Sequence, residues 1–136
     1  MTENDIKNLI SKALTARKNS YSPYSQFAVG SALLSNNGEI FCGCNIENSA
    51  FTPSVCAERV ALFKAVSQGV KKFKAIAVVG GKDTPTDFCP PCGVCRQTLK
   101  EFCNDDFKVI LAKDNLEYKI YTLSELLPHC FDKNNF

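Results

Sequence analysis

Three cysteines and one glutamate have the types and spacing of a catalytic metal site. Cys92 and Cys95 stand three residues apart at a predicted helix start, directly after a pair of prolines, so both sulfurs fall on one helix face. Cys56 occupies a second predicted helix start, and Glu58 follows in its first turn. Thiolate sulfur is a preferred zinc ligand, at Zn–S distances of about 2.3 Å. The pattern predicts that two helix N-termini meet and that their three thiols hold one zinc ion per chain.

A Cys-x-x-Cys pair by itself is also compatible with a redox pair or with two buried thiols. Zinc is favoured here because a third cysteine stands at another helix start, and three ligands with an open fourth position are typical of catalytic sites. Cys89 precedes the prolines, on the wrong side of the helix start, and is interpreted as a bystander. His129, the only histidine, lies far along the chain and is expected in a surface loop.

Glu58 is the candidate general acid and base. A carboxylate in a first helical turn often does no more than complement the helix dipole. Beside a zinc ligand it can take a proton from zinc-bound water, whose pKa the metal lowers towards ~7, and return that proton to the substrate. Three thiolates outweigh the charge of the metal, and donors such as Arg59 and Gln97 are expected to offset the excess. Arg59 could equally be a plain surface cation.

Hydrophobic periodicity and turn signals predict alternating helices and strands over one domain, residues 1–136. An Asn-Gly pair at 37–38 indicates a hairpin between the first two strands, and strands that follow helical crossovers are expected to be parallel. The result is an α/β fold with one mixed sheet and helices on both faces. The predicted helices cover 3–18, 56–69, 92–103 and a short segment ending at 127; the predicted strands cover 27–34, 39–44, 75–79, 109–112 and 118–121.

Composition limits the possible partners. Sixteen basic and 14 acidic residues leave a net charge of +2, which is too small to favour nucleic acid as a partner. No apolar run approaches the ~20 residues that span a bilayer, and the start of the chain is polar. We therefore expect a soluble, cytoplasmic protein with no membrane partner. In that reducing compartment the eight cysteines are expected to bind metal or fill the core rather than form disulfides.

Cys56-Ala57-Glu58, followed by Pro-Cys-Gly-Val-Cys-Arg-Gln at 91–97, resembles the zinc-dependent nucleoside deaminases, specifically the small homotetrameric cytidine deaminases. Further matching segments lie at 21–25, 27–30, 43–48 and 125–128, so the resemblance spans nearly the whole chain. It implies a three-layer α/β/α sandwich with a five-stranded mixed sheet. It also implies hydrolytic deamination of cytidine and 2′-deoxycytidine to the uridine products with release of ammonia, as in pyrimidine salvage.

The resemblance assigns roles residue by residue. Cys56, Cys92 and Cys95 would hold zinc, whose hydroxide attacks C4 of the base while Glu58 shuttles the proton. The remaining positions would contact the nucleoside: Asn45 and Glu47 the ribose hydroxyl, Phe27 the pyrimidine ring, and the backbone around Ala57 the polar edge of the base. From the residues alone, Asn45 and Glu47 would be polar residues of a solvated loop, and Phe27 would be a residue of the hydrophobic core.

Two aromatic positions complete the implied site. Phe51 stands where the family usually has tyrosine, so any hydrogen bond made by that hydroxyl is lost while ring packing is kept. Phe131 matches the aromatic that reaches into the site of a neighbouring subunit, which implies a homotetramer with shared active sites.

Three alternative functions remain open from the sequence. A deaminase acting on blasticidin S or another small molecule could use the same zinc scaffold. A non-catalytic, zinc-stabilised interaction domain would explain the cysteines but leaves Glu58, Asn45 and Glu47 without a role. A nucleic-acid-editing deaminase is disfavoured because the chain is nearly neutral and shows no basic, aromatic strand-binding surface.

Overall fold

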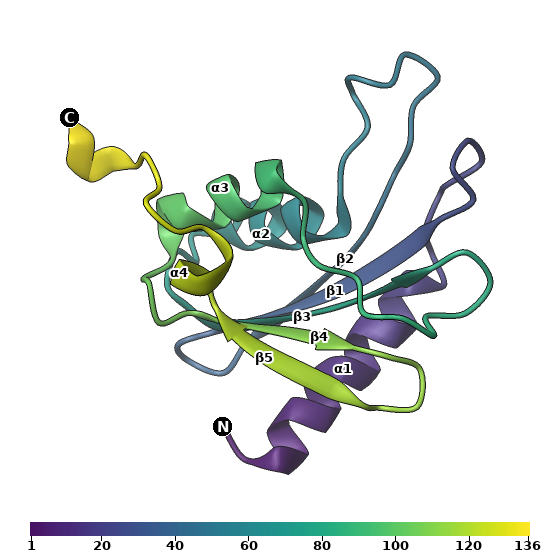
Figure 1. The fold of residues 1–136 in the computed structure, drawn as a ribbon, viewed down its shortest axis with the longest axis horizontal. Helices are drawn as coiled ribbons and strands as arrows, with labels where there is room; N and C mark the ends of the chain where they lie inside the picture. The colour runs from purple at the N-terminus through teal and green to yellow at the C-terminus, as the bar shows by residue number, and fades with distance from the viewer.

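A computed structural model describes all of residues 1–136 and shows one five-stranded sheet between helices (Figure 1). The sequence-based helices and strands are all present, although the third strand is longer at both ends than predicted. In chain order the elements are α1 (Glu3–Arg17), β1 (Ala28–Ser35), β2 (Ile40–Cys44), α2 (Ala57–Ser67), β3 (Phe73–Gly81), α3 (Gly93–Phe102), β4 (Lys108–Ala112), β5 (Tyr118–Thr122), α4 (Leu123–Leu126) and a 3₁₀ turn, Lys133–Asn135.

The sheet is mixed, with strand order β2-β1-β3-β4-β5. The hairpin of β1 and β2 is antiparallel, as expected, and β4 pairs in parallel with β3 after the α3 crossover. β3 pairs antiparallel with β1 and therefore runs parallel to β2, the strand before the α2 crossover, as expected. The connection through α2 carries the chain past β1, so β3 has the same direction as β2 without lying next to it. β5 returns through a short loop and is antiparallel to β4.

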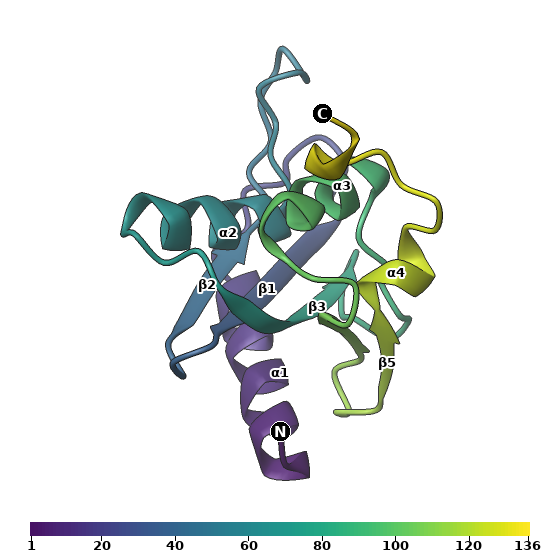
Figure 2. The ribbon, with the colours of Figure 1, turned by 90° about the vertical axis from the view of Figure 1, so that its left-hand side faces the viewer.

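Helices cover both faces of the sheet, which confirms the three-layer α/β/α arrangement (Figure 2). α1 packs on one face, and α2 and α3 pack on the other. Successive residues of a strand point to opposite faces, so β3 contributes to both cores in alternation. Its Ala75, Ala77 and Val79 face α1, whereas Ile76 and Val78 face α2 and α3. Small side chains on the α1 side allow that helix to lie close to the sheet.

Hydrogen-bonded caps fix where the first helix starts. Thr2 accepts a hydrogen bond from the backbone N–H of Asp5 at 3.1 Å, and the Asp5 carboxylate accepts one from the Thr2 N–H at 2.8 Å. This arrangement is a capping box. Thr122 and Glu125 form the same arrangement at α4. No helix of the structure combines the length and apolar character needed to cross a bilayer.

The start of α2 is held directly against the hairpin. A Cβ atom on Gly43 would lie 2.4 Å from the carbonyl oxygen of Ala57, so only glycine permits this approach of β2 to the helix. The same carbonyl accepts a hydrogen bond of 2.8 Å from the buried hydroxyl of Ser31 on β1. These contacts fix Cys56 and Glu58, which flank Ala57, over the end of β2.

Candidate active site

The three cysteine sulfurs meet where α2 and α3 begin. Cys56 and Cys92 are the N-cap residues of the two helices, and Cys95 lies in the first turn of α3. All three sulfurs lie within 4.8 Å of one another, and those of Cys56 and Cys92 are 3.7 Å apart. Two sulfurs at about 2.3 Å from a tetrahedral ion would be about 3.8 Å apart. The donor set therefore fits zinc, and the predicted meeting of two helix starts is confirmed.

The surroundings of Cys56 favour its thiolate. A hydrogen bond from Cys95 and the nearby Arg59 guanidinium hold the pKa of Cys56 well below its usual range. Nη2 of Arg59 lies 3.5 Å from the Cys56 sulfur. Cys95 donates to the Cys56 sulfur, and this hydrogen bond, together with burial, raises the pKa of the Cys95 thiol. A thiolate is the form of cysteine that binds zinc, so a lowered pKa at Cys56 agrees with its expected role as a ligand.

Glu58 is buried beside these sulfurs, with only 4% of its surface exposed. Burial raises the pKa of its carboxyl to about 7, and the charge of Cys56 adds to this shift. A carboxyl group with a pKa near neutrality can both accept and return a proton during a reaction. Glu58 thus has the position and the acidity expected of a general acid and base.

A cavity of about 420 Å³ opens onto these groups, a size typical of small-molecule sites. It lies at the sheet edge where β2 and β3 end and where the two helices start, the usual ligand position in open α/β sheets. Its walls include six of the residues named from the sequence: Phe27, Asn45, Glu47, Cys56, Glu58 and Cys92. Arg59 also lines it, so this residue is part of the cavity wall rather than a plain surface cation.

Asn45 ties the loop before β1 to the segment after β2. Its side-chain oxygen accepts hydrogen bonds from the Val29 backbone N–H, at 2.9 Å, and from the hydroxyl of Ser20. Its side-chain nitrogen donates to the carbonyl of Phe27 at 2.7 Å. One of the two amide hydrogens remains for a ligand. The side chain is thus a structural anchor with one donor left over, rather than a polar group that only faces solvent.

Glu47 receives three hydrogen bonds from the loop that precedes Phe27. The backbone N–H groups of Tyr24 and Ser25 donate to Oε1 at 2.9 and 3.1 Å, and the Ser25 hydroxyl donates to Oε2. The hydroxyl of Ser25, followed by the two N–H groups, lowers the pKa of this carboxyl. Glu47 is therefore a carboxylate held at the cavity rim, with acceptor sites still free for a hydroxyl group.

Cys95 is fully buried behind the cavity surface, and four other predicted site residues do not line the cavity either. Ala57 is buried and offers its backbone alone, while Phe51 is 72% exposed and packs edge-on against Tyr24, with ring centroids 6.2 Å apart. Phe131 is 62% exposed on the C-terminal segment. Gln97 was expected to donate to the sulfurs, but its side-chain nitrogen donates to the carbonyl of Phe131 at 2.8 Å. In this chain Gln97 holds the C-terminal segment against α3.

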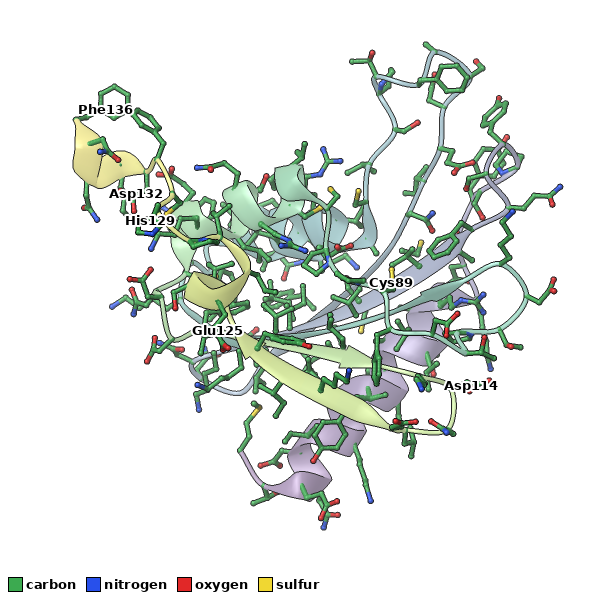
Figure 3. The ribbon with its side chains drawn as sticks, viewed as in Figure 1. Cys89, Asp114, Glu125, His129, Asp132 and Phe136 are labelled. Carbon is green, nitrogen blue, oxygen red and sulfur yellow. The ribbon has the colours of Figure 1, made fainter.

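The position of Cys89 differs from what its sequence suggests. This residue lies outside the group of three close sulfurs, as expected, yet its side chain lines the cavity. Burial raises the pKa of its thiol to about 11, so the thiol is neutral near pH 7. The one signal for its position was its place on the short loop that leads into Cys92. Figure 3 shows Cys89 far from His129, which is exposed beside the C-terminal segment as predicted.

Known proteins share both the sequence and the fold. Residues 3–111 match the family model for the cytidine and deoxycytidylate deaminase zinc-binding region. A cytidine deaminase of Sporosarcina psychrophila is 47% identical over 131 residues, which cover 96% of this chain and 94% of the relative. The crystal structure of cytidine deaminase from Burkholderia pseudomallei superposes with a TM-score of 0.85 at 40% identity, covering 96% of this chain and 100% of that one. A blasticidin-S deaminase of Bacillus cereus is 32% identical, with 78% of each chain covered.

Proposed function

The chain belongs to the cytidine and deoxycytidylate deaminase family and is a zinc-dependent hydrolytic deaminase, and from this premise we propose that its substrates are free cytidine and 2′-deoxycytidine. Water would replace the 4-amino group of the base, giving uridine or 2′-deoxyuridine and ammonia. One observation carries the proposal above the others: a buried carboxyl group stands beside three clustered sulfurs in a cavity whose rim holds an amide and a carboxylate.

Cys56, Cys92 and Cys95 would hold the zinc ion, which when bound supplies hydroxide at neutral pH. Glu58 would hold the proton that water loses and deliver it to the departing amino nitrogen. The pKa of about 7 for Glu58 suits both steps, since neither protonation state is strongly favoured. Arg59 would balance the charge of the three thiolates from its place at the Cys56 sulfur.

The other end of the cavity would bind the sugar. Asn45 has one amide hydrogen to donate, and Glu47 has acceptor sites left for a ribose hydroxyl. Phe27, on the same wall, would pack on the pyrimidine ring. The backbone N–H groups in the first turn of α2, around Ala57, lack partners within the helix and would meet the polar edge of the base.

We also propose a homotetramer in which Phe131 enters the site of a neighbouring subunit. Phe131 packs edge-on against Phe136, 5.6 Å between centroids, on a segment that extends away from the sheet (Figure 1). Gln97 and Lys133 bond this segment to α3 through the carbonyls of Phe131 and Glu101. An exposed aromatic pair held in this way is suited to docking on another copy of the chain. The whole chain, 1–136, would act as one catalytic domain in the cytoplasm, in pyrimidine salvage.

The direct test is the ultraviolet absorbance of cytidine in the presence of purified protein, with and without a chelator. We expect turnover of cytidine and deoxycytidine, one zinc ion per chain, and loss of turnover when zinc is removed. Blasticidin S is the comparison substrate because a relative bears that name. Turnover of blasticidin S alone would replace the proposed substrate, and zinc-loaded protein without turnover would favour an interaction domain.

A further inference from the structure

Cys89 occupies a place in the cavity for which the reaction has no evident use. It lies on the loop between β3 and α3, and its side chain shares the cavity wall with Phe27 and Glu58. It is not one of the three clustered sulfurs, and its thiol is half-buried and neutral near pH 7. A neutral cysteine behaves as a small apolar side chain with a weak S–H donor. Cys89 therefore contributes to the shape of the cavity and adds no charge to it.

Gly80, which has no side chain, leaves room for this thiol. A Cβ atom on Gly80 would lie 2.8 Å from the sulfur of Cys89 and 3.1 Å from Cε1 of Phe27. Both side chains thus rest on the same glycine, at the end of β3, and lie side by side. Gly80 is opposite Val29 in the ladder of β1 and β3, which brings the segment holding Phe27 next to this point. The thiol and the aromatic ring are therefore neighbours in the apolar wall of the cavity.

The chemistry of a pyrimidine nucleoside decides which part of the base this wall meets. Carbon 4 must approach Glu58, and the sugar on N1 must approach Asn45 and Glu47, so the long axis of the base is set. One of the two remaining edges carries N3 and O2, which require donors, and the first turn of α2 supplies free N–H groups. The other edge carries only the C–H groups of carbons 5 and 6. The edge with carbons 5 and 6 should therefore face the apolar wall of the cavity, because a polar atom buried there without a hydrogen-bond partner would be costly.

We propose, on the basis of the function proposed above, that Cys89 contacts carbon 5 of the pyrimidine and limits which substituents are accepted there. Carbon 5 is the neighbour of the reacting carbon 4. Cys89 is likewise close to the reacting end of the cavity, three residues before the zinc ligand Cys92. Phe27 would cover the face of the base, while Cys89 closes its edge.

The test compares cytidine with 5-methylcytidine in the zinc-loaded enzyme. Cys89→Ala should raise the ratio of kcat/KM for 5-methylcytidine to that for cytidine by about tenfold, the usual effect of one carbon in a pocket. Cys89→Val, which adds bulk, should lower the same ratio. Cys42→Ala is the matched control, because Cys42 is a partly buried thiol that does not line this cavity. The binding of 5-methyluridine relative to uridine should shift in the same directions.

A ratio between two substrates does not depend on the fraction of active enzyme, so partial misfolding of a variant cannot imitate the expected result. If both Cys89 variants keep the wild-type ratio within twofold, or if the control moves it equally, the inference is wrong. Absence of cytidine turnover in the wild-type, zinc-loaded enzyme would instead contradict the proposed function itself. The two failures are therefore distinguishable.

Discussion

Nη2 of Arg59 lies 3.5 Å from the sulfur of Cys56, three residues earlier at the start of the same helix. The neighbouring Nε atom is buried and has no hydrogen-bond partner, so the guanidinium is held inside the site. Three thiolates and one Zn²⁺ ion leave one excess negative charge, and Arg59 supplies one positive charge. The (i, i+3) spacing on α2 thus joins a metal ligand to its counter-charge.

Arg59→Met should weaken zinc binding by about 10–100-fold, the usual effect of losing a hydrogen-bond partner of a metal ligand. The substitution keeps an apolar stem of similar length but removes the charge that favours the Cys56 thiolate. Zinc affinity would be measured by competition with a coloured chelator. Lys64→Met is the matched control, since Lys64 is a cation of the same helix that bonds to the carbonyl of Cys42 instead. Equal affinity in the two variants would contradict the role of Arg59.

Glu58→Gln should keep the fold and the zinc content and lower turnover by about 10²–10⁴-fold. The amide has the size of the carboxyl group but cannot accept a proton and return it. The measurement is kcat for cytidine alongside metal analysis of the same sample. Turnover above about a hundredth of wild type in zinc-loaded protein would be too high for a lost general acid and base.

Local signals predicted most of the fold. The two capping boxes and the Asn-Gly turn each depend on residues a few positions apart, so the ends of α1, α4 and the first hairpin could be read directly. The pairing of β3 with β1 could not be predicted in this way. Whether β3 lies next to β2 or on the far side of β1 depends on how α2 packs on the sheet. The strand itself was recognisable from its continuous apolar run.

The site divides in the same way. Spacing within a few residues identified Cys56, Glu58 and the Cys92 pair, and the structure brings them together. The positions of Cys89 and Gln97 depend on contacts across loops. Cys89 meets Gly80, nine residues earlier, and Gln97 bonds to Phe131, 34 residues later. Such contacts leave no period or motif in the sequence, so neither could be predicted from it.

Glu47→Gln should raise KM for cytidine at least about tenfold while zinc content stays at the wild-type level, because hydrogen bonds to charged groups contribute about 1.5–3 kcal/mol. The carboxylate accepts only, and an amide would direct a donor towards the Tyr24 and Ser25 N–H groups. Glu39→Gln, an exposed carboxylate on the hairpin turn, is the control for a simple change of charge. If the two variants had the same KM for cytidine, the proposed contact between Glu47 and the ribose would be wrong.

Stability should fall at alkaline pH because of the buried thiol of Cys103. Burial raises its pKa from 9.0 to about 12, so above pH 9 the unfolded chain loses this proton while the folded chain retains it. The stability linked to this raised pKa is fully present below the pKa of Cys103 in the unfolded chain. It is lost as pH rises towards the folded-state pKa of about 12. Between pH 8 and pH 10 the loss should be about 1 kcal/mol.

Cys103→Val removes this titration and keeps an apolar side chain of similar size. Urea unfolding of both proteins at pH 8 and pH 10 would give the difference in pH dependence, and the zinc cysteines contribute equally to each. We expect the variant to lose about 1 kcal/mol less than wild type over this range. Parallel losses in the two proteins would show that Cys103 does not hold a raised pKa.

Phe131→Ala and Glu58→Gln should complement each other when their subunits exchange. If each site combines Glu58 of one chain with Phe131 of a neighbour, some sites in a mixed tetramer join two unaltered residues. With equal amounts and random assembly, about a quarter of the sites would be intact, because each residue is supplied by either type of chain with equal chance. Activity for cytidine should therefore rise well above the mean of the two separate variants as exchange proceeds. Each variant incubated alone is the control, and activity that stays at their mean would place Phe131 and Glu58 of one site in the same chain or remove Phe131 from the site.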